Sequence, residues 1–162
     1  MSKLTDPTLI YRIPHRTVLC SLEFLRRQGE IEHEGVVLWP GKVSGGTCDI
    51  SDPLIPRQIT GRRFFRIPED EVFRIIQWIS GQELVIPIQI HSHPKAAYHS
   101  DADDEYAFIQ HENAISIVVP YFGSFPASQF LLMARFFRLH AGNEWQEMAE
   151  EMAASVLRFE SQ

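Results

Sequence analysis

A short apolar run that ends in a His-Ser-His-Pro segment constrains this chain more than any other feature. Leu84–Ile90 is apolar and rich in β-branched residues, which predicts a buried strand. Pro87 within this run favours an edge position or an irregularity in the sheet. Alternate side chains of a strand point to the same face, so the imidazoles of His91 and His93 should lie side by side at its end. Pro94 then ends the ladder of hydrogen bonds.

Acidic residues follow this strand at a distance that can complete a metal site. Ser100 is typical of a helix N-cap, and the first turn after it contains Asp101, Asp103, Asp104 and Glu105. Imidazole and carboxylate are common zinc ligands, and three protein ligands leave a fourth position open for a reactive water. The competing interpretation is that the histidines lie at the surface and the carboxylates only complement the helix dipole.

The spacing of these residues resembles the signature of the JAMM (JAB/MPN) zinc metalloproteases, in which His-x-His-Pro is followed by Ser-x-x-Asp. That family also has a glutamate on an upstream strand, and Glu34 at the start of the apolar run to Gly41 matches it. Ile115–Pro120 resembles the strand that follows the signature helix. The resemblance extends over roughly residues 30–123 and keeps the order of the elements.

The resemblance implies a role for each matched residue. His91, His93 and Asp103 would be the zinc ligands. Glu34 would act as the general base toward the zinc-bound water, and Ser100 would help to hold the tetrahedral oxyanion.

Two assignments have alternatives within the sequence. The stretch between the second histidine and the serine is one residue shorter than in the family, so Asp104 is an alternative to Asp103, which the Ser-x-x-Asp spacing favours. Glu30 and Glu32 are alternatives to Glu34, but they are expected to be solvated charges after a helix. A carboxylate at a buried strand needs a compensating partner, and a metal with its water supplies one.

The resemblance implies a zinc-dependent isopeptidase or peptidase that cleaves after the C-terminus of a ubiquitin-like protein. Val118–Gly123 most resembles stand-alone bacterial members. This implies deconjugation or precursor maturation in a bacterial ubiquitin-like conjugation or antiphage pathway. The expected partners are the ubiquitin-like protein, its conjugates and the activating and conjugating enzymes.

Two alternative functions stay within the same family. One is the processing of a sulfur-carrier protein, and the other is a non-catalytic MPN-type scaffold. Scaffold members lack one or more ligands, whereas all the candidate ligands are present here. A zinc deaminase is excluded, because the sequence has no Pro-Cys-x-x-Cys pattern.

The whole chain fits one metalloprotease domain spanning residues 1–162, with 44% hydrophobic and 22% charged residues. The formal net charge of -6 argues against a nucleic-acid partner. The absence of a long apolar run and of a signal peptide predicts a cytoplasmic protein without a membrane span. Cys20 is expected to be a core thiol, and Cys48 in a glycine-rich turn has no partner at a metal-binding spacing.

The pattern of elements predicts an α/β fold, and the family resemblance makes it a JAB/MPN-like three-layer sandwich around a curved mixed sheet flanked by helices. Strands are expected at residues 8–13, 34–42, 47–54, 63–67, 84–90, 115–120, 130–139 and 144–148. Helices are expected at His15–Gln28, with Gly29 as its stop, from Pro68 onward, after Ser100, and over Glu147–Phe159.

The periodicity also predicts which side chains form the core. The expected buried stripes are Val18, Leu19, Leu22 and Leu25 of the first helix and Val72, Ile75, Ile76 and Ile79 of the second. The aromatic residues expected in the core are Phe64, Phe65, Phe73, Trp78, Phe108, Phe136 and Phe137. The remaining histidines are expected at the surface or in supporting positions: His15, His33, His99, His111 and His140.

Overall fold

The structure is a computed structural model that describes residues 4–100, 103 and 107–161. Its elements, in chain order, are β1 (Ile10–Ile13), α1 (His15–Glu30), β2 (Val36–Ser44), β3 (Thr47–Ile50), β4 (Ile59–Gly61), β5 (Phe64–Arg66), α2 (Glu69–Gly81), β6 (Val85–Ser92), β7 (Ile115–Val119), the 3-10 turns η1 (Tyr121–Gly123) and η2 (Ala127–Gln129), α4 (Phe130–Met133), β8 (Arg135–His140), β9 (Glu144–Glu147), α5 (Glu150–Val156) and β10 (Leu157–Phe159). The helix predicted after Ser100 falls mostly outside the described residues.

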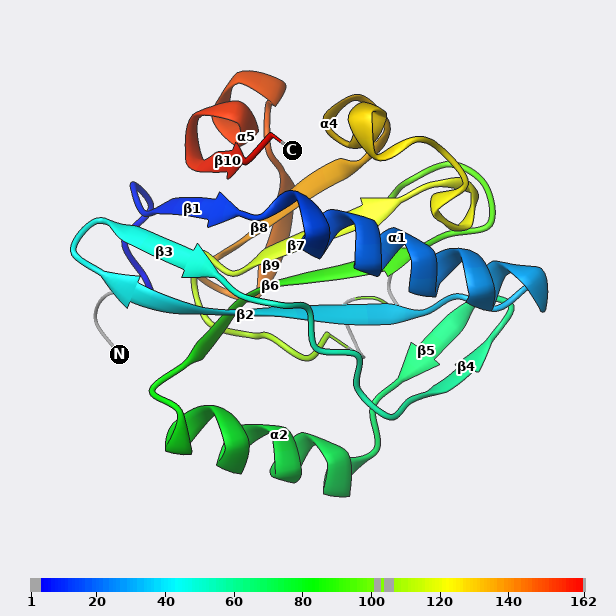
Figure 1. Ribbon diagram of the computed structural model, residues 1–162, viewed down its shortest axis with the longest axis horizontal. Coiled ribbons are helices and arrows are strands. Elements are labelled where there is room, and N and C mark those ends of the chain that lie inside the picture. The colour runs from blue at the N-terminus through cyan, green and yellow to red at the C-terminus, as the bar shows by residue number, and fades with distance from the viewer. Residues whose placement is uncertain (1–3, 101–102, 104–106, 162) are drawn as a thin grey trace.

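A curled mixed sheet organises the described part of the chain (Figure 1). Its strand order is β10-β1-β3-β2-β6-β7-β8-β9, and β4 and β5 form a separate hairpin. The strand that leads to the two histidines, β6, lies in the middle of this sheet. It pairs antiparallel with β2 and parallel with β7.

Pro87 does not place β6 at an edge, contrary to one of the two expectations drawn from it. The register between β2 and β6 shifts between Trp39 and Gly41, so the proline lies at an irregularity of the ladder. On its other side, pairing with β7 begins only at Ile88. The missing N–H of proline is therefore tolerated inside a central strand.

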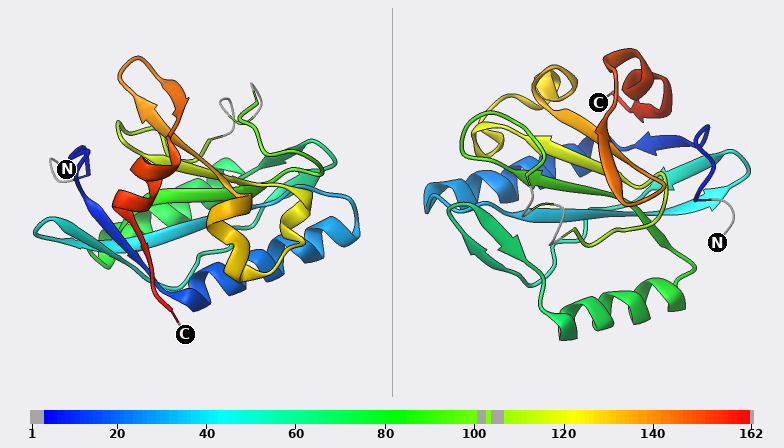
Figure 2. Two further views of the ribbon diagram at one scale, coloured as in Figure 1. Left: turned by 90° about the horizontal axis from the view of Figure 1, so that it is seen from above. Right: turned by 180° about the vertical axis from the view of Figure 1, so that it is seen from behind.

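Helices cover both faces of the sheet, which confirms the predicted mixed α/β architecture (Figures 1 and 2). Alternation along β2 shows the two layers: Val37 and Trp39 belong to one core, and Val36 and Leu38 belong to the other. The first core contains buried residues of α1, α4 and α5, including Leu22, Phe130 and Val156. The second contains Ile75 of α2, together with Phe65 of the hairpin.

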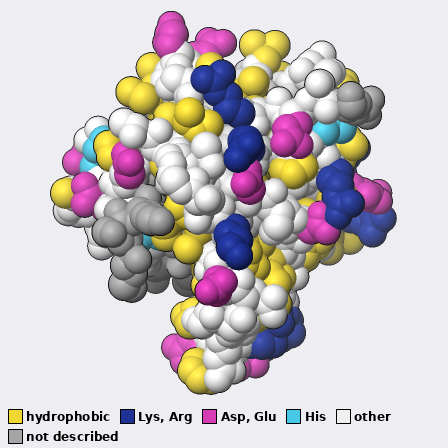
Figure 3. All heavy atoms as spheres, turned by 60° about the vertical axis from the view of Figure 1, so that its left-hand side comes forward, with side chains coloured by type: hydrophobic (Ala, Val, Ile, Leu, Met, Phe, Trp, Pro, Cys, Tyr) yellow, Lys and Arg dark blue, Asp and Glu magenta, His cyan; other side chains and the backbone are white. Residues whose placement is uncertain are grey.

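Several side chains predicted to be buried are exposed instead: Leu19, Cys20, Phe64, Phe73, Ile76 and Trp78. For Phe73, Ile76 and Trp78, the reason is that α2 meets the sheet along a narrow stripe, where Ile75 is buried while Val72 and Ile79 are only partly covered. In Figure 3, α2 forms the lower lobe and carries visible hydrophobic side chains, whereas acidic and basic groups are interspersed over the rest of that face.

The C-terminal third differs from prediction in two places. Residues Phe130–Met133 form the short helix α4, and the strand begins only at Arg135. The expected antiparallel pairing of β8 with β9 is present. The tail is helical over Glu150–Val156, but Leu157–Phe159 then forms a strand that pairs in parallel with β1.

Gly29 is not a helix stop. The helix α1 continues to Glu30, and a Cβ at Gly29 would lie 2.5 Å from the Cβ of Phe122. This glycine therefore permits the close approach of α1 to the turn η1, which follows the strand beside the two histidines.

Candidate metal site

The strand β6 presents His91 and His93 on one face, as the His-x-His spacing predicts. His91 pairs with Val36 of β2 and Val118 of β7, and its side chain is fully buried. His93 follows directly after the strand and is held by its backbone: its N–H donates to Val119 O, and its carbonyl accepts the N–H of Phe122, both at 2.9 Å. Both imidazoles are therefore fixed by the sheet.

Asp103 faces the two histidines and is oriented by Ser100. The Ser100 N–H donates to Asp103 Oδ2 (2.7 Å), and the Asp103 N–H donates to Ser100 Oγ (3.1 Å). This reciprocal pair is a capping box, the local arrangement that a Ser-x-x-acid sequence favours at a helix start. It binds the serine and the buried carboxylate into one unit through the two hydrogen bonds expected of an N-cap serine.

The three side chains converge on one point. Asp103 Oδ2 lies 3.2 Å from His91 Nε2 and 3.1 Å from His93 Nε2. One ligand atom from each residue lies within 4.8 Å of the others, and no other three such side chains among the described residues converge in this way. The alternative ligand, Asp104, lies outside the described residues.

The chemistry of this group fits a metal ion. Both ring nitrogens of His91 and Nδ1 of His93 are buried and have no hydrogen-bond partner among the described residues. Buried polar atoms rarely remain unpaired. An ion bound to the Nε2 atoms and to the Asp103 carboxylate would satisfy two imidazoles at once, and a set of two imidazoles and one carboxylate suits a divalent transition metal.

Asp103 is ionised in this arrangement. Burial alone would raise the pKa of its carboxyl, but the charge of His91, the close contacts with the two imidazoles and the hydrogen bond from the Ser100 N–H together outweigh it and hold the pKa well below its usual range. The carboxylate form is the one that binds metals.

Glu34 lies just before β2 and is buried beside this group. Its N–H donates to Gly61 O (2.9 Å), and the next residue, Gly35, is tied to β6 through the hydroxyl of Ser92 (3.1 Å). Burial raises the pKa of Glu34 to about 7, with a smaller contribution from the charge of Asp103 and opposing ones from His93 and Arg63. A carboxyl of this pKa can both accept and return a proton near neutral pH.

The competing glutamates are exposed, as predicted. Glu30 ends α1, and Glu32 forms an ion pair with Arg62 at 3.4 Å. The structure therefore places Glu34, and neither of these, beside the histidines.

The hairpin β4–β5, of which only the second strand was predicted, contributes to one wall of the site. Its two-residue turn is Arg62-Arg63. A cavity of about 380 Å³ is lined by Glu34, Arg62, Arg63, His93, Pro94, Lys95, Ala96 and Tyr98. The place of Arg62 and Arg63 at the site was not predicted from the sequence, although Gly61 followed by two polar residues between apolar runs is a turn signal.

Aromatic rings surround the histidines. The ring of Phe65 lies 5.2 Å from that of His91, and Tyr98 lies edge-on to His93 at 4.5 Å. His99 stacks on Trp145 and lies 5.9 Å from His91. Among the described residues, Glu34 and His93 line a cavity that gives access to the site.

The other histidines and the cysteines lie elsewhere. His33 contacts Thr60 Oγ1 (2.9 Å), and His111 contacts the Glu112 carbonyl (3.1 Å). Cys48 is buried in β3, and burial raises the pKa of its thiol to about 12, so it is a core thiol and not a metal ligand.

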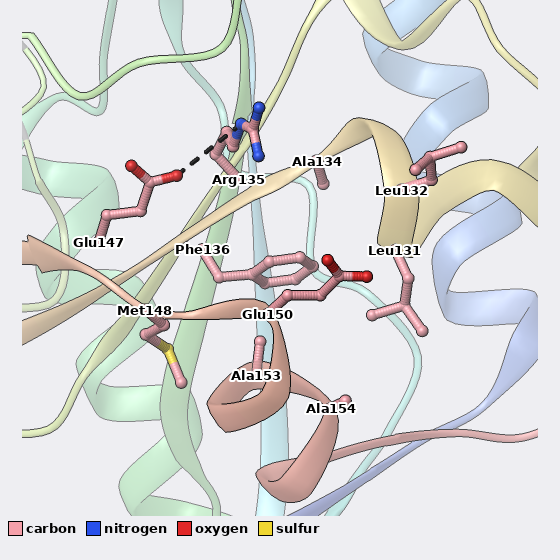
Figure 4. Close-up of a pocket in the computed structure, with 10 residues that line it drawn as sticks. All are labelled: Leu131, Leu132, Ala134, Arg135, Phe136, Glu147, Met148, Glu150, Ala153 and Ala154. Carbon is pink, nitrogen blue, oxygen red and sulfur yellow. Dashed lines mark ion pairs between the residues drawn. The ribbon is translucent and has the colours of Figure 1, made fainter.

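A second cavity, of about 230 Å³, lies between α4, β8, β9 and α5 (Figure 4). Its walls are mostly apolar, and Arg135 is paired with Glu147 at 3.8 Å. This cavity contains no histidine or cysteine. It is therefore a weaker candidate for catalysis than the buried cluster.

Within the described residues, no helix has the length and apolar character needed to cross a membrane.

Comparison with known proteins agrees with this geometry. No protein-family model matches the sequence. The chain is 32% identical to "Probable metalloprotease y4jG" of Sinorhizobium fredii over 165 residues, an alignment that covers 99% of this chain and all of the relative. The solution structure of protein DSY2949 from Desulfitobacterium hafniense has a TM-score of 0.66 at 13% identity and covers 94% of both chains, which shows a shared fold.

Proposed function

This chain belongs to the family of the probable metalloprotease y4jG, and we propose that it is a zinc-dependent peptidase of the JAMM type. The observation that carries the proposal is the buried convergence of His91, His93 and Asp103 at a cavity that also contains Glu34. Two imidazoles and one carboxylate leave a coordination position open, as a hydrolytic zinc site requires. The substrate class we propose is the C-terminal peptide or isopeptide bond of a ubiquitin-like protein.

Zinc in such a site would lower the pKa of a bound water to about 7 and polarise the scissile carbonyl. Glu34 would take the proton from this water, because it is the buried carboxylate that shares the cavity with His93. It would then return the proton to the leaving nitrogen. Ser100 would keep its own hydroxyl proton for the developing oxyanion, since its oxygen accepts the Asp103 N–H without using that proton.

The proposed partners follow from this substrate class. They are a ubiquitin-like protein and its conjugates or precursor, and the activating and conjugating enzymes of the same bacterial pathway. The bacterial source of the relative, Sinorhizobium fredii, supports this setting.

The test is cleavage of a ubiquitin-like protein carrying a C-terminal extension. We expect the zinc-loaded protein to release the extension, and the chelator-treated protein to leave it intact. Glu34→Gln is nearly isosteric but cannot take a proton. It should therefore retain zinc and lose roughly a hundredfold or more in rate.

Two results would contradict the proposal. Equal cleavage by the zinc-loaded and chelated proteins would exclude a metallopeptidase. Zinc binding without cleavage of any such fusion would instead favour the scaffold alternative.

A further inference from the structure

The mouth of the candidate active site is cationic, although the chain has a net charge of -6. Arg62, Arg63 and Lys95 line the cavity beside Glu34 and His93. All three side chains are exposed at its rim. A concentration of positive charge at one opening of an acidic protein attracts an anionic ligand to that opening.

The two arginines are held in place by the framework that positions Glu34. They form the turn of the β4–β5 hairpin, where Gly61 accepts the Glu34 N–H. At the base of the hairpin, Gln58 accepts the Val36 N–H and donates to the Val36 carbonyl, both at 2.9 Å. The turn therefore cannot move far from the buried glutamate without breaking these bonds.

Two of the cations are available to a ligand. Arg62 is paired with Glu32 at 3.4 Å, but Arg63 and Lys95 take part in no ion pair within the described part of the chain. Both carry donors for a carboxylate, and the Arg63 guanidinium can bind one through two parallel hydrogen bonds.

The position of Glu34 decides which part of a substrate these cations meet. A general base that returns its proton to the leaving nitrogen must lie on the amine side of the scissile bond. The hairpin turn lies next to Glu34 in the cavity, so the residue that follows the scissile bond would enter there.

We propose that Arg63 and Lys95 bind a carboxylate on the residue that follows the scissile bond, so that the preferred leaving group is acidic. This inference rests on the proposed peptidase function and specifies its substrate. The carboxylate has two possible sources: the free C-terminus of a one-residue extension, or an Asp or Glu side chain in a longer one. Both present the same ligand to the same cations.

The experiment measures cleavage in a proteome-derived peptide library by the zinc-loaded protein, with cut sites identified by mass spectrometry. We expect Asp and Glu, or a free C-terminus one residue away, to be enriched after the cut. Matched peptides then separate the sources: Asp against Asn in a long extension, and free acid against amide in a one-residue extension. The acidic form should have about five- to twentyfold higher kcat/KM, mostly through KM.

Single-residue variants test whether Arg63 and Lys95 cause the preference for an acidic residue after the cut. Arg63→Ala and Lys95→Ala should each reduce the acidic preference several-fold, measured within each variant as the ratio of kcat/KM for the acidic peptide to that for its neutral analogue. Arg66→Ala, at the opposite end of the hairpin, and Lys42→Ala on β2 are the matched controls and should keep the preference. High salt should weaken the preference in the wild type.

Different results would contradict the acidic preference and the peptidase activity. Equal cleavage of acidic and neutral peptides, or a preference that survives loss of both cations, overturns the inference and leaves the peptidase standing. If no peptide is cleaved, anisotropy of a dye-labelled Gly-Gly-Asp peptide and its Asn analogue still tests the cations. Tighter binding of the Asp peptide that Arg63→Ala abolishes supports the inference, and equal binding rejects it.

Discussion

Asp103 is the residue on which the metal site depends most, because a single carboxylate oxygen meets three partners. Its Oδ2 accepts the Ser100 N–H and faces Nε2 of both histidines. An amide at this position would be neutral and would bind a divalent cation far less well. The most informative substitution is therefore Asp103→Asn, which removes the negative charge and keeps the shape of the side chain.

We therefore expect Asp103→Asn to lose bound zinc and Asp104→Asn to retain it. The measurement is metal content by mass spectrometry after dialysis, with circular dichroism to confirm that both variants fold. If the Asp104 variant lost zinc and the Asp103 variant retained it, Asp104 would be the metal ligand instead of Asp103.

The raised pKa of Glu34 should make the metal-free fold less stable at the pH values where this carboxyl can act as a base. Its pKa is about 7 in the metal-free fold and near 4.5 when unfolded, so folding favours its protonated form. The stability that comes from the neutral acid is present below pH 4.5 and is lost as the pH rises through 7. Above that pH, the buried charge destabilises the fold.

Glu34→Gln should accordingly stabilise the chelated protein at pH 8, by about 2 kcal/mol, and change little at pH 5. Urea unfolding at both pH values measures this difference. An equal effect at the two pH values would show that titration of Glu34 is not its cause.

At the scale of elements, a buried carboxylate fastens α2 to the loop before the hairpin. Glu71 accepts the Arg57 N–H (3.0 Å) and two hydrogen bonds from Arg74 (2.8 and 2.7 Å). The Arg74 hydrogen bonds, followed by that of Arg57, lower the pKa of Glu71 to about 2 against the opposing effect of burial. Since α2 buries little apolar area, this contact has a large share in holding the helix.

We expect Glu71→Ala to destabilise the protein by about 2 kcal/mol at pH 7, because the Arg57 N–H loses its buried acceptor. The folded pKa is depressed, so the contribution is complete above pH 4.5 and is lost as the pH falls toward 2. Asp70→Ala, which removes an exposed pair with Arg57, is the control and should have little effect. Equal losses in the two variants would contradict this account.

At the scale of the whole molecule, the metal site joins segments that are far apart in the sequence. Glu34 enters from the start of β2, the histidines from β6, and Asp103 from the segment after Ser100. An ion that binds only this folded arrangement stabilises the entire fold through mass action.

Chelation should therefore lower the melting temperature of the wild type by about 5–10 °C, for a site occupied near 100 times its dissociation constant. His91→Ala should show no shift on chelation, because it cannot hold the ion. Differential scanning fluorimetry with and without chelator gives both values. A shift of equal size in the His91 variant would place the stabilising metal elsewhere.

Local spacing alone determined much of this site. Period-two alternation placed His91 and His93 on one face, and the Ser-x-x-Asp pattern formed a capping box, because both depend only on neighbouring backbone geometry. The same holds for the β8–β9 hairpin, whose short turn sets its pairing.

The tertiary structure decided what depends on pairing between distant segments. The register of β2 against β6 accommodated Pro87 in a central strand, and Leu157–Phe159 became a strand because β1 offered a free edge. The hairpin brought Arg63 over Glu34 through contacts that no periodicity shows. The exposed aromatics of α2 have the same cause, since periodicity shows that a helix has an apolar face but not how much of that face a neighbour will cover.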